Sequence, residues 1–144
     1  MDAVALKNQL NAHSAAMYAS GSVDQEFQHM QMVEEEGFVA EIVDLYINDV
    51  NTILPNLAAL LEQPEVDFHK VDEAVHQLQA CSSSIGAAKV KLVCQQFRQY
   101  IDAKSKEGCL MVLTIVRNEF HDIRNKFQTM VQLEQQIEAY ATKQ

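Results

Sequence analysis

A long stripe of apolar residues in the second half of the chain limits the folds that this protein can adopt. From residue 113 onward, apolar side chains recur every three or four positions, which is the spacing of one face of an α-helix. The stripe consists of Leu113, Val116, Phe120, Ile123, Phe127, Met130, Leu133 and Ile137. Such a helix needs other helices to cover its apolar face. The pattern therefore predicts a helical bundle.

Helix breakers divide the rest of the chain into a few segments. The 144 residues include only 4 Gly and 2 Pro, so long helices can form between the breaks. The predicted helices cover about residues 3–19, 23–34, 38–63, 68–85, 88–104 and 106–141. Long helices with short connections favour antiparallel neighbours. We predict an all-α fold, an antiparallel four-helix bundle with two additional N-terminal helices.

This fold is expected to form one domain over residues 1–144, with the N-terminal helices at about 3–34 and the bundle at about 37–141. Ser22 is predicted to cap the second helix, with Gln25 reaching back to it. Pro55 predicts a kink or a break one turn earlier in the third helix. Asp67 and Gly86 are expected to start and stop the fourth helix. The predicted apolar stripe of the third helix comprises Phe38, Ile42, Leu45, Tyr46, Ile53, Leu57, Leu60 and Leu61.

The charge of the chain is negative and uneven. Residues 1–88 contain 14 acidic and 2 basic side chains, a charge of −12, whereas residues 89–144 contain 6 and 9, a charge of +3. A chain of net charge −9 is not expected to bind nucleic acid. No apolar run has the length of a membrane span, and the first residues do not resemble a signal peptide. Cys81, Cys94 and Cys109 lack metal or redox spacing and are expected to be reduced thiols.

Helical phase places His76 on the solvent side of the fourth helix. At about 100° per residue, one face of this helix collects Val71, Ala74, Val75, Leu78, Ser82 and Ile85. His76 lies nearly opposite and is predicted to be exposed. Its neighbours on the same face are Asp72, Glu73, Gln79 and Ala80, followed by the small residues Ser83, Ser84 and Ala87. A partner could approach such an imidazole closely.

Residues 75–90, VHQLQACSSSIGAAKV, resemble the signature of plant histidine-containing phosphotransfer proteins. The family pattern is His-Gln, any residue, Lys-Gly-Ser-Ser, any residue, Ser, Ile or Val, and Gly-Ala; its His is the phosphoacceptor. His76 and Gln77 match the start of the pattern, and Ser82 and residues 84–87 match its end. Segments at residues 38–43, 60–64, 66–68, 108–110 and 133–137 are also similar to the family.

The resemblance implies a phosphoryl carrier rather than an enzyme. His76 would accept a phosphoryl group from a receiver domain of a sensor hybrid kinase and pass it to a response regulator, in cytokinin two-component signalling. Neutral imidazole has the lone pair that this chemistry needs. Mg²⁺ would belong to the partner receiver domain, so this chain is expected to hold no cofactor or metal. We expect a monomer in the cytoplasm and nucleus that binds no membrane.

The positions expected to support His76 or bind a partner are Gln77, Gln79, Ala80, Ser82, Ser83 and Lys89. Gln79 and Ala80 stand where the family has Lys and Gly, and Cys81 stands where it has Ser. A Lys would pair with phosphoryl oxygens, so its replacement predicts attenuated transfer. Lys89 and Lys91 either steer an acidic receiver domain or are ordinary solvated lysines.

Two alternatives remain, one from the resemblance and one from residue spacing. The chain could compete for the same receiver domains while transferring little, because the surroundings of its acceptor are altered. Glu73 with His76, and Glu26 with His29, also have the Glu-x-x-His spacing of di-iron bundles. Glu73 and His76 lie on the polar face, however, so a metal site is not expected. The histidines expected at the surface or its boundary are His13, His29, His69 and His121.

Overall fold

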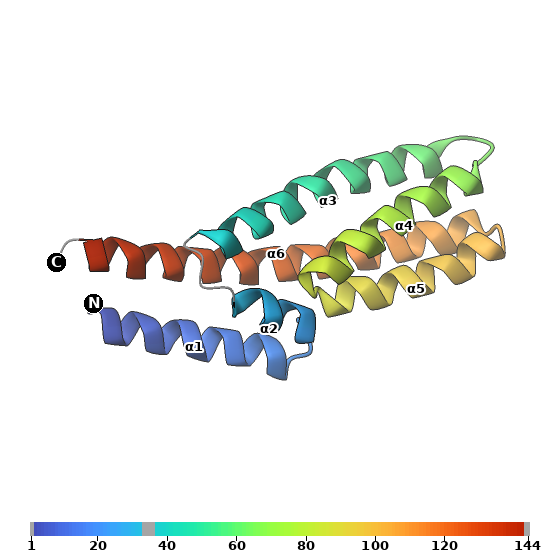
Figure 1. Cartoon of the computed structure of the whole chain (residues 1–144). Helices are drawn as coiled ribbons and strands as arrows, with labels where there is room; N and C mark the ends of the chain where they lie inside the picture. Colours follow the sequence, from blue (N-terminus) through green and yellow to red (C-terminus); the bar gives the residue numbers. More distant parts are fainter. Residues whose placement is uncertain (1, 33–36, 143–144) are drawn as a thin grey trace.

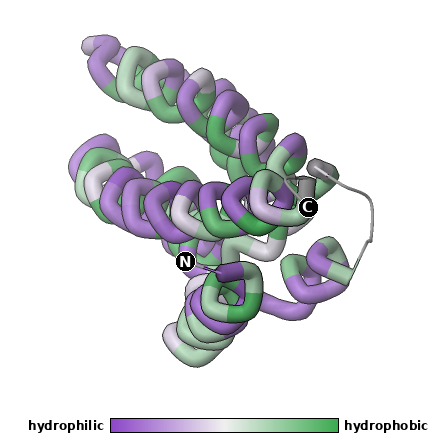
Figure 2. Tube along the Cα trace, turned by 90° about the vertical axis from the view of Figure 1, so that its left-hand side faces the viewer, coloured by the Kyte–Doolittle hydropathy of each residue, from purple (hydrophilic) through white to green (hydrophobic). Residues whose placement is uncertain are grey.

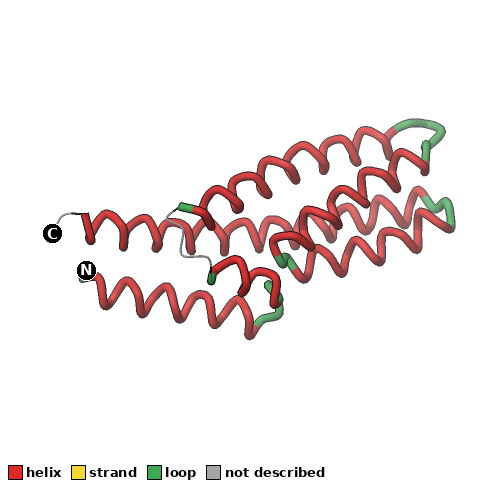
Figure 3. Tube along the Cα trace, in the orientation of Figure 1, coloured by secondary structure: helices red, strands yellow, loops and turns green. Residues whose placement is uncertain are grey.

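Helices account for most of the chain. The computed structural model describes residues 2–32 and 37–142, and the predicted boundary near residue 34 lies outside them. The helices are α1 (Ala3–Ala19), α2 (Gln25–Gln31), α3 (Phe38–Glu62), α4 (Phe68–Ile85), α5 (Ala88–Asp102) and α6 (Lys106–Thr142). The described residues form no strand (Figure 3), although one isolated bridge joins Val23 and Ala87. The predicted all-α class is confirmed.

Helices α3 to α6 form the antiparallel four-helix bundle (Figure 1). Each helix packs against the next, and α3 closes the bundle against α6. Helix α1 lies along the C-terminal part of α6, and α2 packs against α4. With 37 residues, α6 is long enough to belong to the bundle and to carry α1 beyond it. The two N-terminal helices therefore extend one end of the bundle, as predicted.

One apolar core joins the bundle to the N-terminal helices. The fully buried rings of Phe27 in α2 and Phe127 in α6 stack with their centroids 5.2 Å apart. Tyr46 of α3 meets Phe127 edge-on at 6.1 Å. Hydrophobic and hydrophilic residues alternate along the helices (Figure 2), as expected for helices with one buried face. No helix of the described chain is long and apolar enough to cross a membrane.

The apolar stripe predicted for α3 is wrong at Leu45. Tyr46, Ile53, Leu57 and Leu61 are buried, but Leu45 is 59% exposed. The buried face also includes residues that the predicted stripe omitted, namely Val39, Val43, Ile47, Val50 and Leu54. The apolar residues of α3 are distributed over more than one of its faces, so periodicity alone did not identify the buried face. On α6, the stripe is buried as far as Met130.

Helix α3 continues through Pro55, so the predicted alternative of a break is wrong. Proline lacks the N–H that would donate to the carbonyl of Asn51, one turn earlier. Both Pro55 and Asn51 are exposed, and water can therefore satisfy that carbonyl. The helix continues because residues on both sides of Pro55 are buried in the core.

The cap predicted for α2 is also wrong, because Asp24 rather than Ser22 occupies that position. The Asp24 carboxylate accepts a hydrogen bond from the Glu26 N–H at 3.0 Å. Ser22 is buried, and its hydroxyl accepts a hydrogen bond from Nζ of Lys126 at 2.8 Å. Residues 22–24 instead form an extended connection, which we call the strap.

The strap attaches the N-terminal helices to the turn between α4 and α5. The Asp24 N–H donates to the Gly86 carbonyl at 3.0 Å, and the Ala88 N–H donates to the Ser22 carbonyl at 3.1 Å. Gly86 ends α4 with φ of 79°, as its sequence position predicts. Asp67 caps the other end of α4 through a 3.2 Å hydrogen bond from the Lys70 N–H. Both ends of the helix that carries His76 are therefore fixed.

Candidate functional site

His76 projects from the solvent side of α4. The core face predicted for this helix is confirmed, because Val71, Val75 and Leu78 are completely buried. His76 is exposed on the opposite side, also as predicted. The packed face holds the helix against the bundle and so fixes the direction from which a partner can reach the imidazole.

Arg98 of α5 lies against this imidazole. Its Nη2 atom is 2.6 Å from Nδ1 of His76. A guanidinium group only donates hydrogen bonds, so Nδ1 must accept through its lone pair. A neutral His76 ring in this contact therefore carries its proton on Nε2.

Sequence reasoning missed Arg98, which is 22 residues away from His76 along the chain. The contact forms because α4 and α5 are packed neighbours joined by a short turn. Along the sequence, His76 precedes Gly86 and Arg98 follows it by a similar number of residues, so the two can meet across the hairpin. This spacing could have predicted the contact, but only once α4 and α5 were known to pack as neighbours.

Gln79 lies one turn from His76 and is half-buried. Its Oε1 atom is buried without a hydrogen-bond partner among the described residues, and so is Nε of Arg98. One atom is an acceptor and the other a donor, and they belong to adjacent helices. Ala80, the following residue of α4, is exposed. The positive charge beside His76 thus comes from α5 and not from position 79.

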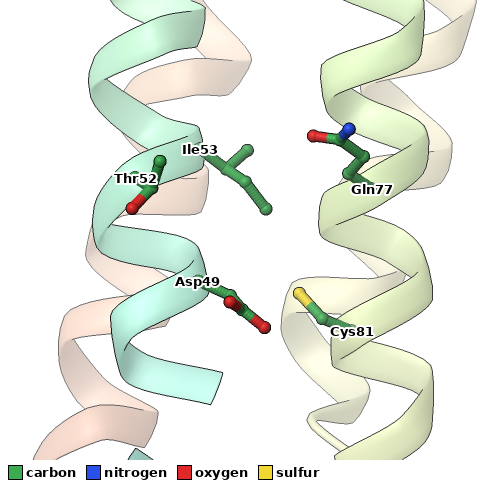
Figure 4. A pocket seen from close by; sticks show the side chains of 5 residues that line it. All are labelled: Asp49, Thr52, Ile53, Gln77 and Cys81. Atoms are coloured by element: carbon green, nitrogen blue, oxygen red, sulfur yellow. The ribbon is translucent and has the colours of Figure 1, made fainter. Parts of the chain in front are cut away.

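Gln77 points to the other side of α4, into a groove against α3 (Figure 4). The groove has a volume of about 330 Å³ and is lined by Asp49, Thr52 and Ile53 of α3 and by Gln77 and Cys81 of α4. A second hollow of about 210 Å³ shares Asp49 and Cys81 and extends to Leu45. The predicted site residues therefore divide between a groove beside α3 and the Arg98 contact beside α5.

Ser82 supports the bundle and does not reach the surface. It is buried, and its hydroxyl lies 3.0 Å from the Tyr46 hydroxyl. Ser83 is half-buried, whereas Ala87 is buried beneath the strap. The accessible strip of small residues is therefore shorter than predicted, because the strap covers its end.

Lys89 and Lys91 lie in the first turn of α5 and are half-buried. Lys89 precedes Arg98 by about 13 Å along the axis of α5, at 1.5 Å per residue. The structure therefore places Lys89 near the α4–α5 turn and not beside His76.

Three of the other histidines have side-chain contacts within the protein. His13 donates through Nε2 to the Lys126 carbonyl at 2.7 Å, and His69 lies 3.0 Å from the Glu73 carboxylate. His121 contacts Arg124 at 2.8 Å. They lie at the surface or its boundary, as predicted, and His29 is exposed. The described residues contain no cluster of three or more His, Cys, Asp or Glu that could hold a metal ion.

The three cysteines are free thiols. Burial raises the pKa of Cys81 to about 11, with a further contribution from the Asp49 charge. Burial raises the pKa of Cys94 to about 12 and that of Cys109 to about 11. At neutral pH all of them are protonated, and a thiol of this kind is a poor nucleophile. His76 is therefore the better nucleophile at this surface.

A protein-family model described as the Hpt domain matches residues 41–142. Histidine-containing phosphotransfer protein 2 from rice (Oryza sativa subsp. japonica) is 54% identical over 148 aligned residues, which cover 100% of this chain and 99% of the relative. The chain belongs to the histidine-containing phosphotransfer family. The resemblance inferred from residues 75–90 is thereby confirmed.

Further members of the phosphotransfer family match over nearly the whole chain. Histidine-containing phosphotransfer protein 1 from rice is 49% identical over 142 residues, or 96% of this chain and 97% of the relative. The crystal structure of a histidine-containing phosphotransfer protein from maize has a TM-score of 0.88 at 57% identity, covering 92% of this chain and 99% of that one. The helical bundle is therefore the fold of phosphotransfer proteins.

Proposed function

We propose that His76 is the phosphoacceptor of this phosphotransfer protein. The observation that carries the proposal is an exposed imidazole, at the His of the family motif, with Nδ1 held by Arg98. Nε2 is the ring nitrogen that Arg98 leaves uncovered, and it becomes the attacking atom when Arg98 withdraws and the ring proton moves from Nε2 to Nδ1. The four other histidines lie outside the motif.

The phosphoryl donor in this proposal is the aspartyl phosphate of a receiver domain. The Nε2 lone pair forms a bond to phosphorus, the bond from phosphorus to the carboxylate oxygen breaks, and its electron pair leaves with that oxygen. The product is a phosphohistidine, which can pass its phosphoryl group to the aspartate of a second receiver domain. The divalent cation of this reaction is assigned to the receiver domain, so the carrier supplies the acceptor and its positioning.

The partners in this proposal are receiver domains of hybrid kinases and of response regulators. They dock over α4, where His76, Ala80 and the groove beside Gln77 lie on the surface. We place the protein as a monomer in a cytokinin phosphorelay of the cytoplasm and nucleus. Free thiols support a reducing compartment.

We further propose that transfer is attenuated. Gln79 brings no charge to the site, and its amide oxygen is buried rather than presented to a partner. The same observation favours a second candidate function, a protein that occupies receiver domains while transferring little. The two candidates differ in transfer rate and not in binding.

The deciding experiment measures transfer from a phosphorylated receiver domain to the wild type and to two variants. His76→Gln should abolish labelling. His69→Gln is the matched control, because His69 is another exposed histidine of α4, and it should be labelled normally. Acid-labile, base-stable phosphate that persists on His76→Gln would contradict the proposal. Comparison with a family member carrying the Lys-Gly motif separates attenuated transfer from simple competition.

A further inference from the structure

We propose that Arg98 is a positioning residue that keeps Nδ1 of His76 unprotonated and thereby prolongs the lifetime of the phosphoryl group. The inference rests on the proposed function, in which Nε2 carries that group. Its basis is the 2.6 Å contact between Nη2 of Arg98 and Nδ1 of His76. No residue of the motif around His76 supplies this contact.

The contact differs from one made by a mobile surface arginine. Arg98 is half-buried, and its Nε atom is buried within the protein. Packing between α4 and α5 therefore restricts the guanidinium group, while the imidazole that it contacts is exposed. A restricted donor beside an exposed acceptor can hold that acceptor in one protonation state.

In the unloaded protein, the contact places the ring proton on Nε2, which masks the attacking atom. Before attack, Arg98 must withdraw, Nε2 must lose its proton to water, and Nδ1 must take a proton from water. Nε2 then attacks with its lone pair, and the resulting ring carries a proton on Nδ1 and phosphorus on Nε2. Loss of the Nδ1 proton to water allows Arg98 to return.

In the loaded protein, the same contact protects the bond between Nε2 and phosphorus. When that bond breaks, its electron pair goes to Nε2, and the leaving group is neutral imidazole only if Nδ1 is already protonated. Arg98 and a proton cannot both occupy the Nδ1 lone pair, because both would be donors. A loaded ring held by Arg98 is therefore a poor leaving group, and water removes the phosphoryl group slowly.

Two acidic residues share this face with His76. Asp72 and Glu73 precede it by about one turn on α4. Glu73 is already engaged with His69. From α5, the charge that meets the ring is Arg98. A docking receiver domain could attract the guanidinium group of Arg98 with its own carboxylates. Nδ1 would then be free to take a proton at the moment of transfer.

The test uses the full-length protein loaded with phosphoramidate, a small phosphoryl donor that requires no docking. Arg98→Met removes the donor and the charge but keeps an unbranched stem, whereas Arg98→Gln keeps a donor without the charge. Arg124→Met is the matched control, because Arg124 makes the same kind of contact to Nδ1 of His121 at 2.8 Å. Circular dichroism establishes that each variant is folded.

The expected result is a phosphohistidine lifetime that is shorter in Arg98→Met by about three- to tenfold, as loss of one ordinary hydrogen bond at an exposed group implies. Arg98→Gln should be intermediate, and Arg124→Met should match the wild type. Nitrogen NMR shifts of the loaded ring should show an unprotonated Nδ1 in the wild type and a partly protonated one in Arg98→Met. A purely structural role would change stability without moving these shifts.

Equal lifetimes in folded Arg98→Met, Arg98→Gln and wild type would overturn the inference while leaving the proposed function intact. A wild-type spectrum with a proton on Nδ1 of the loaded ring would also overturn it, and that measurement needs no variant. Failure of the wild type to load at His76 would overturn the proposed function and the inference together.

Discussion

The Arg98 guanidinium of α5 lies beside the imidazole of His76, while the neutral amide of Gln79 occupies the next turn of α4. A cation at position 79 would lie on the same face of α4 as His76, because residues three apart are neighbours on a helix surface. Arg98 reaches Nδ1 from the adjacent helix α5.

Replacement of Gln79 by lysine is expected to raise the transfer rate or the lifetime of the phosphorylated form. A partly exposed ion pair contributes about 0.2–1 kcal/mol, and repulsion from Arg98 keeps the gain small. This corresponds to about a 1.4- to fivefold change in single-turnover transfer from a phosphorylated receiver domain.

The matched control for this substitution is Gln136→Lys, which adds the same charge at an exposed position near the C-terminal end of α6. It should leave both quantities unchanged. Identical kinetics in Gln79→Lys and the wild type would show that the charge at position 79 does not limit transfer.

The buried thiols predict an alkaline limit to stability. Burial raises the pKa of Cys81 and Cys109 to about 11 and that of Cys94 to about 12, and it also raises the pKa of Tyr46. Because the folded pKa exceeds that of the unfolded chain, the unfolded chain loses protons first. The free energy of unfolding should therefore hold below about pH 9 and fall as the pH rises toward 11–12.

Urea denaturation at several pH values between about 8 and about 11 checks this expectation. Cys94→Ala is the informative variant, since it removes the thiol whose pKa burial raises most and should flatten the fall in the free energy of unfolding. A free energy of unfolding that stays constant across this range would contradict the assignment to buried thiols.

At the scale of the elements, the strap decides how the N-terminal helices meet the bundle. Gly86 has φ of 79°, and a Cβ atom at this position would lie 2.5 Å from the backbone nitrogen of Phe27 and 2.6 Å from Oδ1 of Asp24. Gly86→Ala should therefore destabilise the protein by about 2–4 kcal/mol, from backbone strain and overpacking together.

The control for Gly86→Ala is Gly37→Ala, at nearly the same φ of 80° but with nothing within 4 Å of the added carbon. Urea denaturation of both variants separates the cost of the backbone angle from the cost of the contact. Equal losses would show that the close approach of α2 to this turn contributes little.

Local signals were sufficient for most helix ends, because Asp67 and Gly86 act within one turn of their own position. They failed at Ser22, whose hydroxyl is taken by Lys126, 104 residues away. Leu45 was misplaced for a similar reason, since the buried face of α3 is chosen by its neighbours. Within the candidate site, helical phase and the family motif predict the exposure and the role of His76. The contact with Arg98 could not be predicted in this way, because it depends on the packing of α4 against α5.

Over the whole molecule, acidic residues dominate the first 88 positions and basic residues the remainder. Lys89, Lys91 and Arg98 all belong to α5, so the helix next to His76 is locally basic in a protein of net charge −9. Such a local field can steer an acidic partner even when the net charge opposes the approach.

The variant Lys89→Gln with Lys91→Gln should slow association with a receiver domain by about two- to fivefold at low ionic strength. The difference should disappear at about 500 mM salt, where screening is nearly complete. Lys7→Gln on α1 is the control. Stopped-flow association rates that are equal for all three proteins at low salt would contradict steering.

The contact between His76 and Arg98 makes the lifetime of the phosphoryl group depend on whether the bundle is folded. The two side chains come from different helices and meet only when α4 and α5 are packed. A molecule whose hairpin has opened retains its histidine but loses the guanidinium group that preserves the phosphoryl bond. On the proposed mechanism, damaged or partly unfolded copies would lose the phosphoryl group to hydrolysis sooner. Copies with an intact bundle would retain it for transfer to a receiver domain.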